Sequence, residues 1–407
     1  MTALAIVLAV VAAGCGSTRH AVGRAHSATA PTAPRASRGE RPAYASWPQY
    51  GRNPQRTGLA GDVAIRPPYR VRWAVDVGRF LEFPPAIVGG RLFVATDPGR
   101  LLALDSSTGA VDWSLSTHRC SAASPAVRRG VVYFALMDPP PCGDQPRSGR
   151  VIAVRARDGK TLWTFSCGVS ESSPLVVGST VYVGSQDGRL YALDARTGRA
   201  RWSFQTAGKI KGGAAFADGT VFVGSYDGRV YAIEARSGRL RWSASVGAPV
   251  YASPAIGAGR LVVGTLAGNV YALELSDGRT SWTRRTGSYV YSSAAISGGT
   301  AFVGSYDGRL YALRLADGSV RWEYGAGSPV SGTPTVVDGV VYFSRCLRCW
   351  AGRNFHVPPR TFAVDAASGR LLWAFPDGEY TPVVTDGRLA FLDGYARLYA
   401  LSASRPS

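Results

Sequence analysis

The sequence predicts an all-β fold: an eight-bladed β-propeller of four-stranded antiparallel blades, closed by a strand from the N-terminal side. Three observations predict it. Tryptophans recur at steps of 40, 50, 39, 40, 40, 40 and 51 residues, the best-preserved copies show no helical period, and each copy holds four short apolar runs. A repeat of about 40 residues with four strands is typical of a propeller blade. The repeated tryptophans are Trp73, Trp113, Trp163, Trp202, Trp242, Trp282, Trp322 and Trp373.

One copy of the repeat, residues 175–204, illustrates the four strands that are expected in each blade. Its four runs, rich in β-branched and aromatic residues, are 175–177, 181–185, 189–194 and 199–204. Such residues favour strands, and each run is bounded by turn residues. The pair Asp187-Gly188 between the second and third runs tolerates the positive φ of a tight hairpin. The four runs are therefore expected to form an antiparallel meander.

The ring closure follows from the order of the strands. A single blade leaves two apolar faces, so the blades must pack on one another, and the repeated indoles are expected between them. After Trp373 the chain supplies only three strands, at 381–384, 388–391 and 397–401. Residues 69–77 form a lone strand before the first complete copy. We expect this strand to complete the eighth blade from outside.

The residues that lead up to each repeated tryptophan resemble a motif of a known protein family. A pattern of the kind A-x-D-x-x-[TS]-G-x-x-x-W recurs up to each tryptophan from Trp113 to Trp373. It resembles the tryptophan-docking motif of pyrroloquinoline-quinone (PQQ) repeat propellers, and the entry Trp47-Pro48-Gln49-Tyr50 is similar to the lead-in of that family. The resemblance covers about residues 47–403 and implies the propeller fold. The family includes quinoprotein dehydrogenases as well as the propeller lipoproteins of the outer-membrane β-barrel assembly machinery, so the resemblance alone does not imply one activity.

The N-terminal residues predict export. An apolar run at 3–13 is too short to span a bilayer but suits a signal peptide. It ends in Ala12-Ala13-Gly14-Cys15, which resembles a lipobox and implies a lipid on Cys15; a plain secretory signal is the alternative. We therefore divide the chain into a lipoprotein signal peptide (1–14), a disordered tether (15–46), the propeller (47–403) and a tail (404–407). The expected location is extracytoplasmic, on a membrane of the cell envelope.

Basic residues dominate the propeller. The formal charge is +19, and the net +4 of residues 1–46 leaves +15 on the remainder. Several arginines share one repeated position after a turn glycine, as Arg189, Arg229 and Arg309 do, which predicts a ring of charge. Such a ring attracts anionic lipid, envelope polymer or acidic protein, although solubility alone also explains it. No nucleic-acid module is present, and no nucleic-acid partner is expected.

The cysteines are disulfide candidates because the chain is predicted to be exported. In a four-stranded blade the second-to-third-strand hairpin and the crossover to the next blade emerge on one face. Cys120, Cys142 and Cys167 therefore share a neighbourhood, and the favoured pair is Cys120 with Cys167. Cys346 and Cys349 are expected to form a C-x-x-C bridge. No metal site is expected, since a zinc site would need further ligands.

The two long tryptophan steps locate insertions at 137–150 and 345–360, on the face that carries the cysteines. Long loops on a rigid scaffold often carry function. We predict this face as the binding face. Its candidate residues, from the crossovers and the second insertion, are Lys209, Lys211, Tyr251, Tyr289, Tyr291, Trp350 and His356.

Catalytic residues are not predicted. Neither G-x-S-x-G nor H-E-x-x-H occurs, and the adjacent Cys-Cys pair of alcohol-oxidising quinoproteins is missing; Glu82 and Glu171 are the only crossover acids worth testing as ligands or bases. The preferred hypothesis is a monomeric, non-catalytic scaffold that binds other envelope proteins and needs no cofactor. One alternative is an oxidoreductase using PQQ with calcium. Another is an envelope-glycan-binding propeller that uses Trp350 and the tyrosines.

Overall fold

A computed structural model describes residues 45–404, apart from 79–80, 98, 141–147, 347–348, 350–357, 379–383 and 395. One compact unit spans Tyr44–Ser407. The signal peptide, the tether and the lipid attachment at Cys15 lie outside the described residues and stay predictions. No helix among the described residues is long and apolar enough to cross a membrane.

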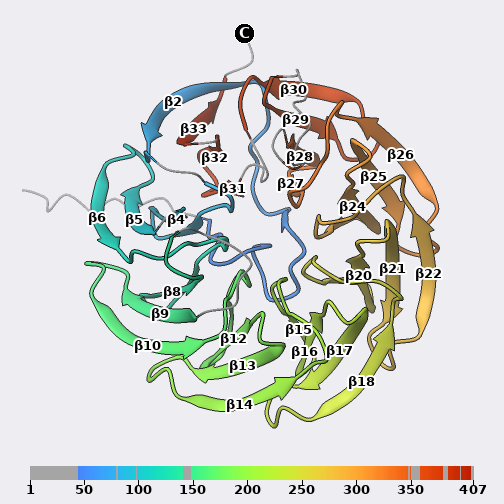
Figure 1. Ribbon diagram of the computed structural model, residues 1–407. Helices are drawn as coiled ribbons and strands as arrows, with labels where there is room; N and C mark the ends of the chain where they lie inside the picture. Colours follow the sequence, from blue (N-terminus) through green and yellow to red (C-terminus); the bar gives the residue numbers. More distant parts are fainter. Residues whose placement is uncertain are drawn as a thin grey trace, which may run out of the picture. The chain divides into compact units, whose positions relative to one another are not determined.

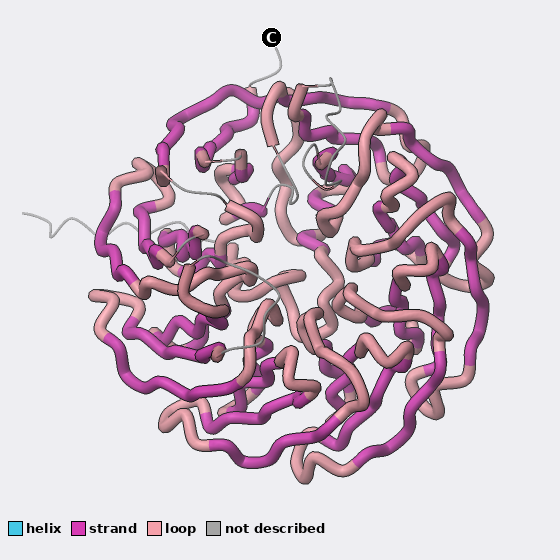
Figure 2. The backbone as a smooth tube through the Cα atoms, viewed as in Figure 1, coloured by secondary structure: helices cyan, strands magenta, loops and turns pink. Residues whose placement is uncertain are grey.

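Eight sheets surround a common centre within this unit (Figure 1), and the described residues contain strands and loops but no helix (Figure 2). Seven sheets are consecutive meanders. Blades one to four are β3 (Ala86–Val88), β4 (Arg91–Thr96), β5 (Arg100–Asp105), β6 (Val111–Ser116); β7 (Ala126–Arg128), β8 (Val131–Leu136), β9 (Gly149–Arg155), β10 (Thr161–Cys167); β11 (Leu175–Val177), β12 (Thr180–Gly184), β13 (Arg189–Asp194), β14 (Ala200–Gln205); and β15 (Ala215–Ala217), β16 (Thr220–Gly224), β17 (Arg229–Glu234), β18 (Leu240–Ser245).

The remaining blades include two that use strands from the N-terminal side. They are β19 (Ala255–Gly257), β20 (Arg260–Gly264), β21 (Asn269–Glu274), β22 (Thr280–Arg285); β23 (Ala295–Ser297), β24 (Thr300–Gly304), β25 (Arg309–Arg314), β26 (Val320–Gly325); β27 (Thr335–Val337), β28 (Val340–Arg345), β29 (Arg360–Asp365), β30 (Leu371–Phe375), joined by β1 (Leu59–Ala60); and β31 (Val384–Thr385), β32 (Ala390–Asp393), β33 (Arg397–Ala403), joined by β2 (Tyr69–Asp76).

The predicted closure is confirmed. Strand β2 pairs antiparallel with β33, in a register that runs from Tyr69 opposite Ala403 to Asp76 opposite Arg397. Tyr69 also reaches the seventh blade, because its ring packs edge-on against Trp373 at 5.2 Å. The eighth blade therefore joins strands from opposite ends of the chain, and the ring has no free end.

The repeated indoles dock each blade on the next one. From Trp73 to Trp322, each indole N–H donates to a backbone carbonyl of the following blade at 2.9–3.1 Å. The motif glycine of that blade lies under the indole: a Cβ added to Gly238 would come within 2.8 Å of the Trp202 ring. The glycine of the motif thus serves the indole contact as well as its own positive φ of 75°.

A largely irregular segment, residues 45–60, which ends in the short strand β1, fills the centre of the ring and appears in blue in Figure 1. It meets every blade. Backbone amides of the innermost strands donate to its carbonyls, as Ile87 does to Trp47 and Ile296 to Thr57, each at 2.8 Å. The third blade instead uses the Gln49 side chain, and Ala45 donates to Asp386 of the eighth. Because inner strands would otherwise expose unpaired edges, this segment satisfies them. The sequence indicated only a family lead-in here.

Arg56 anchors this central segment. Its side chain is fully buried and donates to the carbonyl oxygens of Tyr50, Ser173, Pro174 and Ala214. One guanidinium thus links the segment to the third and fourth blades. Burial lowers the pKa of Arg56 to about 10, which still leaves it charged at neutral pH.

Candidate functional site

One repeated position on the crossovers surrounds the mouth of the ring. Each such residue lies four positions before the first residue of an innermost strand, as Tyr251 lies four positions before Ala255 of β19. We call this set the mouth ring. Its members in blades one to seven are Glu82, Ala122, Glu171, Lys211, Tyr251, Tyr291 and Ser331. The docking position of the repeat keeps a tryptophan in every copy, whereas this position carries two acids, a base, two tyrosines, an alanine and a serine. The copies therefore differ chemically at the mouth.

Glu171 organises the polar half of the mouth. Its carboxylate forms an ion pair with the Lys211 ammonium at 3.0 Å, and both side chains are about nine-tenths buried. The same carboxylate accepts from the Gln186 amide at 2.6 Å and from the Tyr251 hydroxyl at 3.3 Å. Buried ion pairs need such additional hydrogen bonds to offset their desolvation. The arrangement holds both charges in place beside the axis.

Glu82 faces this pair from the first crossover. Burial raises the pKa of Glu82 to about 8, with further contributions from Glu171 and Asp97, while Lys211 opposes the shift. At neutral pH this carboxyl is therefore mostly protonated and available as a hydrogen-bond donor. The mouth thus presents one neutral acid beside one ion-paired carboxylate.

Four tyrosines form the aromatic half. Tyr291 lies at the centre, with its ring 4.8 Å from both Tyr251 and Tyr306. Tyr289 packs against Tyr291 and Tyr306 at 6.4 and 6.3 Å, and half of its side chain remains exposed. Tyrosines are enriched where proteins bind partners, and Tyr289 is the exposed member of this cluster.

The mouth is shallow. The cavity between the polar and aromatic halves has a volume of about 20 Å³, and Tyr50 of the central segment lies at its base. That volume admits about one water molecule. PQQ does not fit this cavity in the described arrangement. No group of three His, Cys, Asp or Glu side chains able to hold a metal ion occurs among the described residues.

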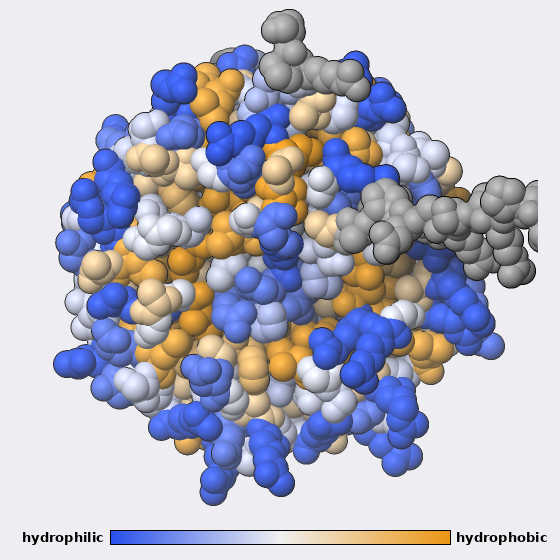
Figure 3. Space-filling view, turned by 180° about the vertical axis from the view of Figure 1, so that it is seen from behind, coloured by the Kyte–Doolittle hydropathy of each residue, from blue (hydrophilic) through white to orange (hydrophobic). Residues whose placement is uncertain are grey.

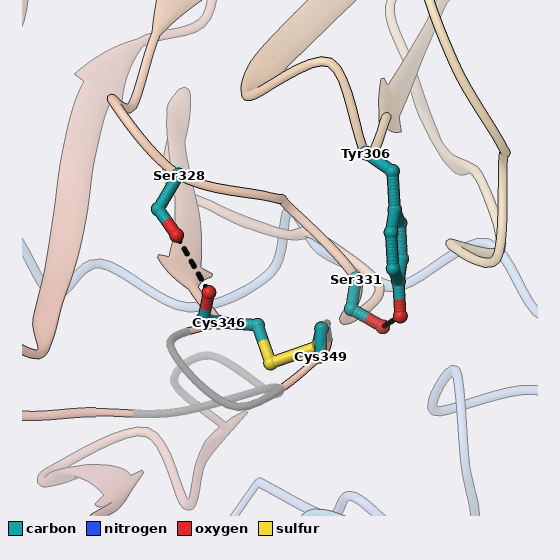
Figure 4. The surroundings of a disulfide bond; sticks show 5 residues. All are labelled: Tyr306, Ser328, Ser331, Cys346 and Cys349. Atoms are coloured by element: carbon teal, nitrogen blue, oxygen red, sulfur yellow. Dashed lines mark hydrogen bonds between the residues drawn. A yellow bond between two sulfur atoms is a disulfide. The ribbon is translucent and has the colours of Figure 1, made fainter. Parts of the chain in front are cut away.

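A disulfide lies beside the mouth, in the seventh blade (Figure 4). It joins Cys346 to Cys349, and Ser328 donates to the Cys346 carbonyl at 2.7 Å. Nearby, the Tyr306 and Ser331 hydroxyls lie 3.2 Å apart. The aromatic cluster is thereby tied to the crossover that precedes the seventh blade.

The expected pair of Cys120 with Cys167 is wrong. Cys120 is disulfide-bonded, whereas Cys167 is a free thiol. Cys167 ends the outer strand β10, whose residues alternate between exposed and partly buried positions, and burial raises the pKa of this thiol to about 12. Sharing one face was therefore insufficient to pair the two sulfurs. Cys142 lies outside the described residues.

The structure brings together part of the predicted binding face. Lys211, Tyr251 and Tyr291 line one cavity, with Glu171, and Tyr289 joins their aromatic cluster. The partly exposed Lys209 lies two positions before Lys211 on the same crossover. Trp350 and His356 lie outside the described residues.

Sequence reasoning missed Tyr306, Gln186 and Tyr50. The first two stand in hairpins read only as turn chemistry, although each occupies the position directly before the Asp-Gly pair. Comparing that position across copies would have revealed them.

The repeated arginines lie on the third strands. Arg189 contacts the Ser203 hydroxyl at 3.2 Å, Arg229 contacts Ser243 at 2.8 Å, and Arg309 forms an ion pair with Glu323. Each of these guanidinium groups therefore contacts a side chain on the outer strand of its own blade. Hydrophilic side chains project around the rim of the face shown in Figure 3.

The family model described as outer membrane protein assembly factor BamB matches residues 61–209 and 202–405. A comparison with curated protein sequences gave no match.

Several solved structures share the fold. BamB from Moraxella catarrhalis has a TM-score of 0.66 at 16% identity, covering 84% of this chain and 99% of that one. Quinohemoprotein alcohol dehydrogenase from Comamonas testosteroni has a TM-score of 0.69 at 14% identity, covering 89% and 82%. The computationally designed Ika8 protein has a TM-score of 0.66 at 14% identity, covering 81% and 98%. At these identities the likeness shows the fold alone. The family match spans most of the chain, which therefore belongs to the family of outer membrane protein assembly factor BamB.

Proposed function

We propose that this chain is a non-catalytic, lipid-anchored scaffold of the cell envelope that binds another envelope protein at the mouth of its ring. The observation that carries the proposal is the mouth itself. Its cavity of about 20 Å³ leaves little room for a small substrate, yet it carries a cluster of tyrosines with Tyr289 half exposed. A surface of this kind suits contact with a protein segment better than enclosure of a small molecule.

The mouth favours one partner chemistry. The acids Glu82, Glu171 and Asp97 lie on one side, and the tyrosines lie on the other. A segment with an apolar or aromatic residue and an adjacent hydrogen-bond donor would match both halves. Membership of the BamB family supports an assembly role. The lipid on Cys15 and the envelope location remain part of this proposal.

In-cell photocrosslinking tests the proposal. A photoreactive phenylalanine analogue placed at Tyr289 is expected to give a discrete adduct with one envelope protein. The matched control is the same analogue at Val111, whose side chain is equally exposed but starts an outer strand. Adducts at both positions, or at neither, would contradict a mouth-specific partner. Loss of the adduct in a Tyr306→Ala background would support the aromatic cluster as the contact.

A quinoprotein oxidoreductase is the second candidate, favoured only by the fold shared with an alcohol dehydrogenase. Titration with PQQ and calcium, followed by absorbance and by dye reduction with alcohols or sugars, separates the two. Saturable binding with turnover would replace the scaffold proposal. Envelope glycan binding through Trp350 is tested by pull-down on wall polysaccharide, where Trp350→Ala must lower retention for this alternative to stand.

A further inference from the structure

A groove on the other face of the ring has the character of a ligand site. It opens between the second and third blades, where the first-to-second and third-to-fourth strand turns meet, and its volume is about 510 Å³. Ligand pockets in proteins commonly have volumes of about 300–1,000 Å³. The charged side chains that line it are Arg128, Arg129, Arg196, Arg201 and Asp194. Its apolar wall includes Tyr133 and Leu162, and Leu162 is 43% exposed.

The repeat supplies an internal comparison. The same groove between the fourth and fifth blades has a volume of about 370 Å³ and carries one arginine, Arg241, and one acid, Asp218. Ala217 and Asp218 stand there at the positions of Arg128 and Arg129. The fold therefore does not require basic residues at these positions, and the excess of positive charge belongs to the groove between blades two and three.

Three of these four arginines lack an ion-pair partner among the described residues. Of the four, only Arg201 forms an ion pair among the described residues, with Asp194 at 2.7 Å. The other oxygen of Asp194 already accepts from the Arg196 and Thr197 backbone amides and from the Thr197 hydroxyl. The Nε of Arg128 is buried and has no hydrogen-bond partner within the described structure. A buried donor without a partner is costly, so a bound acceptor would relieve that cost.

We propose that this groove binds an organic phosphate, with the phosphate held by Arg128 and Arg129 and an apolar body lying against Tyr133 and Leu162. Guanidinium groups bind phosphate through paired, charge-assisted hydrogen bonds, and phosphate offers more acceptor oxygens than a carboxylate. The apolar wall selects an ester with a hydrophobic substituent rather than inorganic phosphate. The site lies away from the mouth, and its occupancy does not depend on a partner there.

Calorimetric titration of the full chain with phenyl phosphate at low salt tests the site. The expected result is saturable binding at one site per chain, weakened at least tenfold by Arg128→Ala with Arg129→Ala and reduced by added salt. The matched control, Arg241→Ala, is expected to leave binding unchanged. Benzyl alcohol is expected not to bind. Absence of saturable binding, or equal binding by the double variant, would overturn the proposal.

Sedimentation with phosphatidylglycerol–phosphatidylcholine vesicles distinguishes the source of the phosphate. If a lipid headgroup supplies it, the double variant loses vesicle binding relative to the parent chain. If the natural ligand is soluble, phenyl phosphate binding falls in the double variant while vesicle binding stays the same.

A transfer experiment provides a gain of function. Ala217→Arg with Asp218→Arg places the arginine pair in the groove between blades four and five, at a backbone position whose φ of 47° matches the 48° of Arg129. The stoichiometry of phenyl phosphate is expected to rise from one to two per chain, with an unchanged thermal midpoint. A folded variant that still binds one equivalent would show that the arginine pair does not determine the site.

Discussion

The indole of Trp202 lies directly over Gly238 of the next blade, and its N–H donates to the Ala235 carbonyl at 3.0 Å. Equivalent tryptophan and glycine residues of neighbouring blades form the same contact elsewhere in the ring. A single contact, repeated, therefore holds neighbouring blades together. It also explains why the motif specifies both a tryptophan and a glycine.

Substitution of Gly238 by alanine is expected to destabilise the propeller by about 3 kcal/mol, since the new methyl group meets the indole and φ is unfavourable. Gly219→Ala is the matched control, because its φ of 71° is similar but an added Cβ meets nothing within 4 Å. Its cost should be only about 1 kcal/mol, from backbone strain. Denaturant unfolding measures both. Equal losses would show that the indole contact contributes little.

Deletion of the central segment is expected to destabilise the whole ring. A chain that begins at residue 61 keeps the closing strand β2 but leaves the inner-strand amides without the acceptors of residues 45–60. At about 1 kcal/mol for each lost hydrogen bond, the loss is on the order of 5 kcal/mol or more. Thermal unfolding measures it, against a chain that begins at residue 45. Equal midpoints would mean that the segment is a passive filler.

Glu82 is expected to make stability depend on pH. Its pKa of about 8 lies above the ordinary value of 4.5, so between these values the folded state holds a proton that the unfolded state has lost. The free energy of unfolding must then fall as pH rises from about 5 to 8, by on the order of 3 kcal/mol. Glu82→Gln should flatten this slope.

Glu234→Gln serves as the control for that series. Hydrogen bonding from Ser237 lowers the pKa of Glu234, so its titration lies below this pH range. Urea unfolding at several pH values gives the comparison. A parent chain whose stability rises between pH 5 and 8, with Glu82→Gln unchanged in slope, would contradict the assignment.

Cys167 is expected to resist alkylation in the folded protein. Partial burial raises the pKa of its thiol to about 12, so the reactive thiolate is scarce at pH 8. Iodoacetamide should label Cys167 slowly in the native chain and readily after unfolding in denaturant without reductant. Peptide mass mapping reads the result. Rapid native labelling would show that the outer strand β10 opens easily.

The strand order, the blade count and the closure were predictable because each depends on local chemistry repeated eight times. Residues 189–194 were predicted as a strand and form β13 with the same bounds. Some strand boundaries next to turns differ by one residue from the prediction. The second strand of that blade begins at Thr180 rather than at residue 181, because Thr180 pairs with Asp194.

The candidate site was only partly predictable. Lys211, Tyr251 and Tyr291 were identified from their place on the crossovers, but the ion pair between Lys211 and Glu171 joins consecutive blades and depends on how the ring curves. The pairing of Cys120 failed for the same reason: one face can be deduced from topology, whereas a sulfur–sulfur distance cannot.

The sequence by itself determined the repeat, the eight-bladed ring and the role of its tryptophans, because periodic packing and turn formation depend on residues that are close together in the sequence. Only the tertiary structure decided that residues 45–60 fill the centre, that Arg56 is satisfied there by backbone carbonyls, and that Arg128 is left with an unpaired buried donor. Each of these features depends on contacts between residues that are far apart in the chain. Such contacts follow from how the blades are arranged in the closed ring, which the local sequence pattern does not specify.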